Sequence, residues 1–277
     1  MSNPGLQYDP KSYARYRPTY AANFYDSIYA TADIPDYDTA LDVGTGTGQV
    51  AQVLAERFRR VIGTDISSTQ LGEAVRLPNI RYLETPAETL EGVEDDSVDL
   101  ITVGVAYHWF DHAKFLEACR RVLRPAGALA VWGYSYSELR PGSAASPAAD
   151  AAAFARANEA FQELHNGTLG PYWESGRKFL DQRYEGVKPG PESFETCSPL
   201  TVQTMEKSYS LNDMIGYLSS WSPYHRFLRE NPGGQDPLES FKAALADILS
   251  IDDADKPDTI LNVWPLCGFV ATKPVKS

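Results

Sequence analysis

The sequence predicts an α/β protein built on a doubly wound, mostly parallel β-sheet. Short apolar runs alternate with amphipathic stretches from about residue 39 to residue 134, as expected for strands joined by crossover helices. A glycine-rich turn separates the first apolar run from the first amphipathic stretch. Because crossovers between parallel strands are right-handed, this alternation predicts helices on both faces of one sheet.

The expected strands and helices follow one another in a regular order. Five strands are expected at residues 40–44, 60–65, 80–84, 98–106 and 128–134. Three helices are expected between them, at residues 49–58, 67–76 and 112–124. Pro125 and Gly127 then end the last of these helices.

Beyond residue 134 the alternation ends. Residues 135–153 are rich in Ser, Pro, Gly and Ala and predict a linker that runs into a helix. Residues 167–224 carry scattered aromatic side chains, which we interpret as a cap with a strand near residues 196–209. Residues 259–274 predict a long strand that returns to the sheet edge.

We therefore expect four consecutive segments in the chain. They are an N-terminal arm and helix (1–30), an α/β core with the glycine-rich turn (31–140), a cap with a returning strand (141–225), and a C-terminal helix and edge strand that completes the sheet (226–277).

Composition restricts the partners and the compartment. The formal net charge of -12 repels phosphate backbones and anionic lipids, so neither a nucleic acid nor a membrane is an expected partner. The three cysteines are far apart and lack metal-ligand spacing, which predicts no metal site and favours a reducing, cytoplasmic location. The expected partner is a small-molecule substrate, and the protein is expected to be a monomer or a homodimer.

The glycine-rich turn at residues 42–48 (DVGTGTG) is typical of a nucleoside cofactor site. Missing side chains at Gly44, Gly46 and Gly48 let a ligand approach the backbone. The dinucleotide pattern G-x-G-x-x-G would need a glycine at position 49, where this chain has Gln49, so adenosylmethionine is favoured over NAD. Asp65 ends the second expected strand, where its carboxylate can accept hydrogen bonds from both ribose hydroxyls.

These residues resemble the class I S-adenosylmethionine-dependent methyltransferases, which have a Rossmann-like, mostly parallel seven-stranded sheet. The resemblance implies that the turn holds the methionine part of S-adenosylmethionine and that the acid after the second strand holds its ribose. It also implies that residues 86–88 (PAE) face the adenine and that residues 105–111 (VAYHWFD) flank the transferred methyl group. The implied cofactor-binding residues in these segments are Asp42, Gly44, Thr45, Gly46, Gly48, Asp65, Ile66, Ala87, Glu88 and Val105.

A closer resemblance is to the trans-aconitate methyltransferase group, which includes enzymes that methylate a carboxylate of cantharidin. Its motifs recur at residues 13–20 (YARYRPTY), 108–111 (HWFD), 132–134 (WGY), 170–174 (GPYWE) and 221–225 (WSPYH). The resemblance implies that Tyr13 and Arg17 close over the cofactor, with Arg17 pairing with its methionine carboxylate. Val105 departs from the group, because its relatives often carry Gln or Glu there, and the chain lacks an arginine-dense loop for a tricarboxylate.

Two kinds of methyl acceptor follow from this resemblance. A carboxylate is ionised at neutral pH and needs only orientation, whereas an alcohol or phenol needs a base, for which His108 is the candidate; its alternative role is to orient or support the loop. The first hypothesis is methyl ester formation on a small organic acid. The second is O-, S- or N-methylation of a larger natural product in secondary metabolism or detoxification. Further alternatives are a binding protein without turnover and an NAD oxidoreductase.

Aromatic and basic residues near the expected cap are the candidates for substrate binding. Arg177 can pair with a substrate carboxylate in bidentate fashion. The full set is Trp109, Tyr134, Tyr172, Trp173, Arg177, Trp221, Tyr224 and His225.

Overall fold

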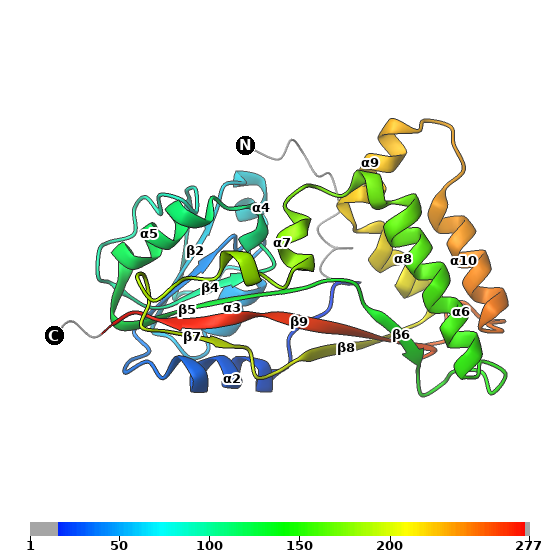
Figure 1. The fold of residues 1–277 in the computed structure, drawn as a ribbon, viewed down its shortest axis with the longest axis horizontal. Helices are drawn as coiled ribbons and strands as arrows, with labels where there is room; N and C mark the ends of the chain where they lie inside the picture. Colours follow the sequence, from blue (N-terminus) through cyan, green and yellow to red (C-terminus); the bar gives the residue numbers. More distant parts are fainter. Residues whose placement is uncertain (1–15, 275–277) are drawn as a thin grey trace. The chain divides into compact units, whose positions relative to one another are not determined.

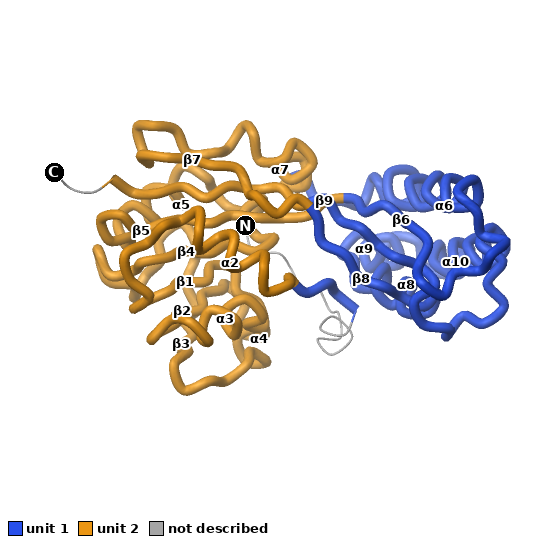
Figure 2. The backbone as a smooth tube through the Cα atoms, turned by 90° about the horizontal axis from the view of Figure 1, so that it is seen from below, with its two compact units in different colours: residues 1–19, 136–175, 204–265 blue, residues 20–135, 176–203, 266–277 orange. Residues whose placement is uncertain are grey.

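The computed structural model describes residues 16–274, which divide into two compact units. Each unit is assembled from separate parts of the chain (Figure 2). Among the described residues, unit 1 contains 16–19, 136–175 and 204–265, and unit 2 contains 20–135, 176–203 and 266–274.

Unit 2 contains a seven-stranded sheet in the order β3-β2-β1-β4-β5-β9-β7. Strands β1 to β5 pair in parallel, and β9 pairs antiparallel with β5 on one side and β7 on the other (Figure 1). The predicted mostly parallel seven-stranded sheet is therefore confirmed. The strand bounds are β1 Thr39–Val43, β2 Arg60–Asp65, β3 Ile80–Glu84, β4 Val98–Gly104, β5 Leu123–Tyr134, β7 Thr196–Pro199 and β9 Ile260–Thr272.

The buried strands present two apolar faces. Leu129 and Val131 of β5 belong to one core cluster with Phe115 of helix α5 (His112–Val122). On the opposite face of β5, the ring of Trp132 contacts Phe24 of α2 (Ala22–Ala32) at 5.3 Å between centroids. Because successive strand residues point to opposite sides, this alternation places helices on both faces of the sheet.

Local capping explains where the helices of unit 2 begin. Asp111 caps α5 by accepting from the amide of Lys114, and Ser67 caps the short α4 (Ser68–Gly72) by accepting from the amide of Gln70. Helix α3 (Gln49–Leu54) begins after Gly48, and α7 is Arg177–Asp181. The helices expected at 49–58 and 67–76 are thus shorter than predicted, because each continues as turns.

Unit 1 combines a small antiparallel sheet with helices. Strands β6 (Glu138–Pro141) and β8 (Thr204–Tyr209) both pair with the first residues of β9. Asp150, Ser210 and Asp236 cap three of the helices through their side chains. The helices are α6 Ala151–Gln162, continued by a π-helical turn at Glu163–Thr168, then α8 Leu211–Ser219, α9 Ser222–Glu230 and α10 Pro237–Ile248.

Two expectations about the later strands need correction. Strand β9 is not at the sheet edge, because β6 and β8 pair with its first part and β5 and β7 pair with its second part. The strand expected near 196–209 is two strands, β7 in unit 2 and β8 in unit 1, separated by residues 200–203. No helix within residues 16–274 is long and apolar enough to cross a membrane.

Candidate cofactor and acceptor sites

The glycine-rich turn adopts a backbone conformation that requires glycine. Gly44, Gly46 and Gly48 have φ angles of +69°, +58° and +85°, in the left-handed region. A Cβ atom on Gly44 would lie 2.5 Å from the Cβ of Ala106. The turn is tied to β2, because the amides of Gly44 and Thr45 donate to the carbonyl of Thr64 at 2.8 and 2.9 Å. The turn therefore offers a partly exposed, preformed backbone surface between β1 and α3.

Asp42 stabilises this turn through hydrogen bonds of its side chain. Its carboxylate is buried, with Oδ2 accepting from the Thr45 hydroxyl at 2.5 Å and Oδ1 accepting from the Thr102 hydroxyl at 2.8 Å. Burial is the main cause that raises the pKa of Asp42 to about 6, and the two hydroxyl bonds lower it in part. Asp42 thus holds the turn in shape through Thr45.

Asp65 lies at the end of β2, as predicted, beside the same turn. Its Oδ2 accepts from the amide of Gly46 at 2.9 Å, and its Oδ1 accepts from the amide of Ser67 at 2.9 Å. Each carboxylate oxygen has a second lone pair, so the side chain can still accept from the hydroxyls of a ribose. Ile66, which follows it, is 55% exposed and offers an apolar surface. The glycine cradle and this carboxylate fit an adenosyl cofactor.

The segments predicted to flank the adenine and the methyl group are joined to each other. Ala87 is buried, and Oε1 of Glu88 accepts from the amide of Asp111 at 3.0 Å. Val105 has a φ of +57°, and its amide donates to the carbonyl of Trp132 at 2.8 Å. A left-handed conformation is strained for valine, and such strain is concentrated at functional sites, so the turn after β4 is a candidate part of the site.

His108 lies in a 3-10 turn (Tyr107–Trp109) and is buried. Burial is the main cause that lowers the pKa of His108 to about 4, and the positive charge of Arg177 adds to it. The imidazole is therefore uncharged at neutral pH. Its Nδ1 lies 3.5 Å from the hydroxyl of Tyr184.

Arg177 begins α7, whose preceding residue Gly176 packs against His108. A Cβ on Gly176 would lie 2.4 Å from the carbonyl oxygen of His108. The Arg177 side chain is 16% exposed, and its Nε lies 3.0 Å from Oδ1 of Asp181. Its Nη2 donates to the hydroxyl of Ser135 at 3.2 Å, and that hydroxyl donates to Asp181 at 2.8 Å. The predicted substrate arginine is thus a half-buried cation that contacts both Ser135 and Asp181.

Two further residues that were predicted to bind the methyl acceptor belong to unit 2. Trp109 is 48% exposed, whereas Tyr134, at the end of β5, is buried. The sequence reasoning missed Ser135, Asp181 and Tyr184, which contact the predicted residues. The i, i+4 spacing of Arg177 and Asp181 is the one signal that could have revealed Asp181.

The remaining residues that were predicted to bind the methyl acceptor lie in unit 1. Tyr172 accepts from Asn231 at 2.9 Å, and the hydroxyl of Tyr224 donates to Asp236 at 2.8 Å. His225 has a buried Nε2 with no hydrogen-bond partner within residues 16–274. The roles of these three residues stay predictions.

Trp173 and Trp221 form part of an aromatic cluster in unit 1. Their ring centroids are 5.4 Å apart, and His165 lies 4.9 Å from Trp173 and 5.4 Å from Trp221. Tyr136 and Phe161 also belong to this cluster. His165, in the π-helical turn, was not predicted, because its sequence context carries no recognised motif.

The two residues predicted to close over the cofactor have different outcomes. Arg17 lies in unit 1, where its guanidinium donates to the hydroxyl and the carbonyl of Ser220 at 3.1 and 3.2 Å. Its predicted pairing with the cofactor stays a prediction. Tyr13 lies outside the described residues.

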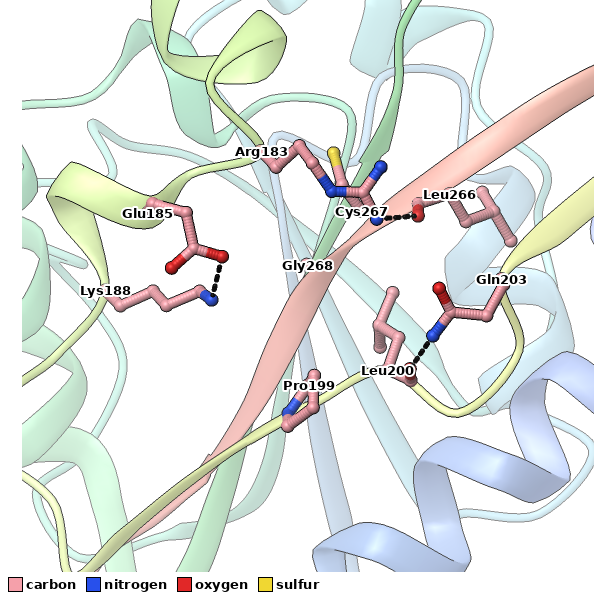
Figure 3. A pocket seen from close by; sticks show the side chains of 9 residues that line it. All are labelled: Arg183, Glu185, Lys188, Pro199, Leu200, Gln203, Leu266, Cys267 and Gly268. Atoms are coloured by element: carbon pink, nitrogen blue, oxygen red, sulfur yellow. Dashed lines mark hydrogen bonds and ion pairs between the residues drawn. The ribbon is translucent and has the colours of Figure 1, made fainter.

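A small surface pocket of about 50 Å³ in unit 2 contains none of the predicted residues (Figure 3). Its two basic side chains are engaged, since Lys188 pairs with Glu185 at 2.7 Å and Arg183 donates to the carbonyl of Leu266 at 3.3 Å. No group of three or more potential metal ligands occurs among the described residues.

Comparisons with known proteins agree with this geometry. Residues 41–131 match the model of a methyltransferase domain family. A Dictyostelium discoideum protein named as a methyltransferase is 35% identical over 246 residues, covering 88% of this chain and 86% of that protein. A trans-aconitate 2-methyltransferase of Deinococcus radiodurans is 32% identical over 131 residues, covering 46% of this chain and 49% of that protein.

A solved structure described as a type II methyltransferase from Anaeromyxobacter dehalogenans also matches. It superimposes with a TM-score of 0.73 at 28% identity and covers 93% of this chain and 99% of that chain. The resemblance to the S-adenosylmethionine-dependent methyltransferases, stated from the sequence motifs, is therefore confirmed over most of the chain.

Proposed function

Because this chain belongs to the class I S-adenosylmethionine-dependent methyltransferases, we propose that it methylates a carboxylate of a small organic acid. When bound, S-adenosylmethionine supplies a methyl group carried on a positively charged sulfur. The observation that carries the proposal is a cationic Arg177 beside a buried, uncharged His108.

The protonation of His108 favours an acceptor that is already ionised. A general base works best when its pKa lies near the working pH, and the pKa of His108 is lowered to about 4. Such a weak base is poorly suited to removing a proton from an alcohol or a phenol. A carboxylate needs no base, because it is ionised at neutral pH.

Arg177 supplies the charge that would hold such an acceptor. Its planar guanidinium matches the geometry of a carboxylate, and its side chain is largely removed from water. The chain as a whole has a formal net charge of -12, so a local cation is needed to attract an anion. The partial match to a trans-aconitate 2-methyltransferase supports the same substrate class.

The reaction then depends on positioning. Bound S-adenosylmethionine would supply the methyl group to a carboxylate oxygen and leave as S-adenosylhomocysteine, and because that oxygen is already ionised, no residue of this chain would need to take a proton. The glycine turn and Asp65 would hold S-adenosylmethionine, and Arg177 would orient the carboxylate acceptor. Holding both reactants in line can lower the barrier by about 7 to 11 kcal/mol.

The direct test uses the purified protein with S-adenosylmethionine carrying a labelled methyl group. We would assay one panel of small di- and tricarboxylic acids and one panel of phenols, alcohols, thiols and amines. The proposal predicts label in products that release methanol on mild alkaline treatment, as methyl esters do. Label found solely in alkali-stable products would overturn it.

Substitution of Arg177 tests the acceptor site separately. Arg177→Ala should raise the KM for an anionic acceptor about 10-fold to 100-fold, since charge-assisted hydrogen bonds contribute about 1.5 to 3 kcal/mol. Cofactor affinity should stay unchanged. Arg226→Ala is the matched control, because Arg226 pairs with Glu230 at the same i, i+4 spacing. Equal losses of acceptor and cofactor affinity in the Arg177 variant would count against the assignment.

A second candidate is methylation of an oxygen, sulfur or nitrogen on a larger apolar molecule. Exposed Ile66 and Trp109 in unit 2 favour this alternative, since exposed apolar side chains suit an apolar ligand. Alkali-stable products from the second panel would identify it.

A further inference from the structure

The hydroxyl of Tyr184 has one hydrogen-bond partner among the described residues. Tyr184 is fully buried, and its hydroxyl lies 3.5 Å from Nδ1 of His108. No other hydrogen-bond partner of this hydroxyl occurs within residues 16–274. The contact is long, but such contacts in ligand-free sites tighten when the reactants bind.

Two features of the chain hold this hydroxyl against His108. Arg183 and Tyr184 have φ angles of +56° and +60°, so a left-handed turn aims the ring inward immediately after α7. A Cβ atom on Gly133 would lie 2.7 Å from the Tyr184 hydroxyl, so the absence of a side chain there makes room for it. The ring also packs edge-on against Tyr107, with centroids 5.4 Å apart.

The proton arrangement follows from the partners available. A buried phenol hydroxyl must donate its proton or lose a hydrogen bond, and Nδ1 is its only acceptor among the described residues. Nδ1 can accept only if it carries no proton. In an uncharged imidazole the proton must then be on Nε2, which makes Nε2 a donor.

The charged neighbours of His108 do not reverse this arrangement. Arg177 and Asp181 on α7 act in opposite directions on its pKa, and His112 on α5 lowers it further. Among the described side chains, Tyr184 alone forms a hydrogen bond with the ring nitrogens of His108.

We propose that Tyr184 is a positioning residue that keeps His108 in the Nε2–H tautomer, so that Nε2 donates a hydrogen bond to the acceptor's carboxylate instead of removing a proton. The identity of the acceptor rests on the proposed function, whereas the tautomer rests on the contacts of His108 alone. An Nε2–H group of His108 can stabilise a bound carboxylate through this hydrogen bond. The same nitrogen cannot remove a proton from an alcohol, because it already carries one.

Nitrogen NMR tests the tautomer without any methyl transfer. The chain has four histidines, so ¹⁵N-histidine labelling gives few signals, and the His108→Gln variant assigns the one that disappears. We expect an unprotonated-type Nδ1 resonance and a protonated-type Nε2 resonance for His108 at pH 7.5. Tyr184→Phe keeps the ring but should move both resonances toward the averages of a tautomer mixture. Tyr37→Phe, a half-buried tyrosine elsewhere in unit 2, should leave them unchanged.

An Nδ1-protonated His108 in the unsubstituted protein would overturn the proposal, as would resonances unaffected by Tyr184→Phe. If the tautomer is as proposed but no carboxylate is methylated, the proposed function fails and this assignment stands.

Activity gives a second readout. The amide nitrogen of Gln can replace an Nε2–H donor but cannot replace a base. His108→Gln should therefore retain carboxylate methylation within about 10-fold of the unsubstituted enzyme, whereas His108→Leu should lose more. A base role predicts that both variants lose about 10²-fold to 10⁴-fold, and that result would contradict the proposal.

Discussion

Asp65 is the residue whose contacts bear most directly on cofactor binding. It accepts from the amides of Gly46 and Ser67 and therefore links the glycine turn to the start of α4. This arrangement explains why an acid is needed at the end of β2. A side chain without oxygen atoms at this position would lose both amide contacts and also remove the acceptor for the ribose hydroxyls.

Asp65→Ala should weaken binding of S-adenosylhomocysteine by about 1.5 to 3 kcal/mol, as expected for loss of charge-assisted hydrogen bonds. Isothermal titration calorimetry measures this difference. Asp26→Ala is a suitable control, because Asp26 is an exposed acid of the same unit that pairs with Arg57. An affinity unchanged by Asp65→Ala would place the cofactor elsewhere.

Asp42 and His108 should give folding stability opposite pH dependences. The pKa of Asp42 is raised from 3.8 to about 6, so its contribution is present below pH 4 and is lost as the pH rises through 6. The pKa of His108 is lowered from 6.5 to about 4, so its contribution is present above pH 6.5 and is lost as the pH falls toward 4. Each effect is at most about 3 kcal/mol.

Denaturant unfolding at pH 4, 5, 6 and 7 separates the two groups. Relative to the unsubstituted protein, Asp42→Asn should gain stability as the pH rises, whereas His108→Gln should lose it. The same pH dependence in both variants and the unsubstituted protein would show that neither pKa is shifted by folding.

The residues found from the sequence are those that lie within one continuous motif. Asp42, Gly44 and Gly46 occupy neighbouring positions, so their spacing alone predicted the turn. Tyr184 meets His108 across 76 positions of sequence, and Ser135 meets Arg177 across 42. Spacing carries no signal for such contacts, because they depend on how distant segments pack.

At the scale of elements, β9 has the largest structural role among the later strands. Its Gly268 has a φ of +151°, and a Cβ there would lie 2.0 Å from the carbonyl oxygen of Val131 on β5. A side chain at this position would force β9 and β5 apart, in the middle of the sheet of unit 2.

Gly268→Ala should therefore reduce the free energy of unfolding by about 2 kcal/mol or more, which is in the range of severe backbone and packing mutations. Chemical denaturation measures the loss. Gly72→Ala is the matched control, because a Cβ there meets nothing within 4 Å, so it should be neutral or slightly stabilising. Equal stability of the two variants would contradict the role given to Gly268.

Element prediction succeeded where periodicity and length agreed. The apolar runs of β1, β2 and β3 matched the observed strands within one residue, because these strands are bounded by turns and capped helices. The position of β9 was missed. A long apolar strand can lie at an edge or in the interior, and its pairing with β7 and β8 depends on segments that the sequence presents as irregular.

At the scale of the whole molecule, both units are discontinuous in sequence. Unit 1 takes residues from three parts of the chain, and β9 contributes residues 260–265 to unit 1 and 266–272 to unit 2 (Figure 2). The four consecutive segments expected from composition do not follow this division. Composition changes along the chain reveal linkers, but they do not reveal which distant segments share a core.

Amide hydrogen exchange should show where cofactor binding acts. Adding S-adenosylhomocysteine should slow exchange in residues 42–48, 64–70 and 85–90 of unit 2, because these segments contain the glycine turn, Asp65 and the turn after β3. Protection limited to unit 1, or absent from residues 42–48, would be inconsistent with the proposed cofactor site.

The most direct measurement is a crystal structure of the protein with S-adenosylhomocysteine. The account predicts that the ligand lies on the glycine turn at residues 44–48, with its ribose hydroxyls within hydrogen-bond distance of the Asp65 carboxylate. A ligand bound at another place in the protein, with this turn and Asp65 free of contact, would contradict it.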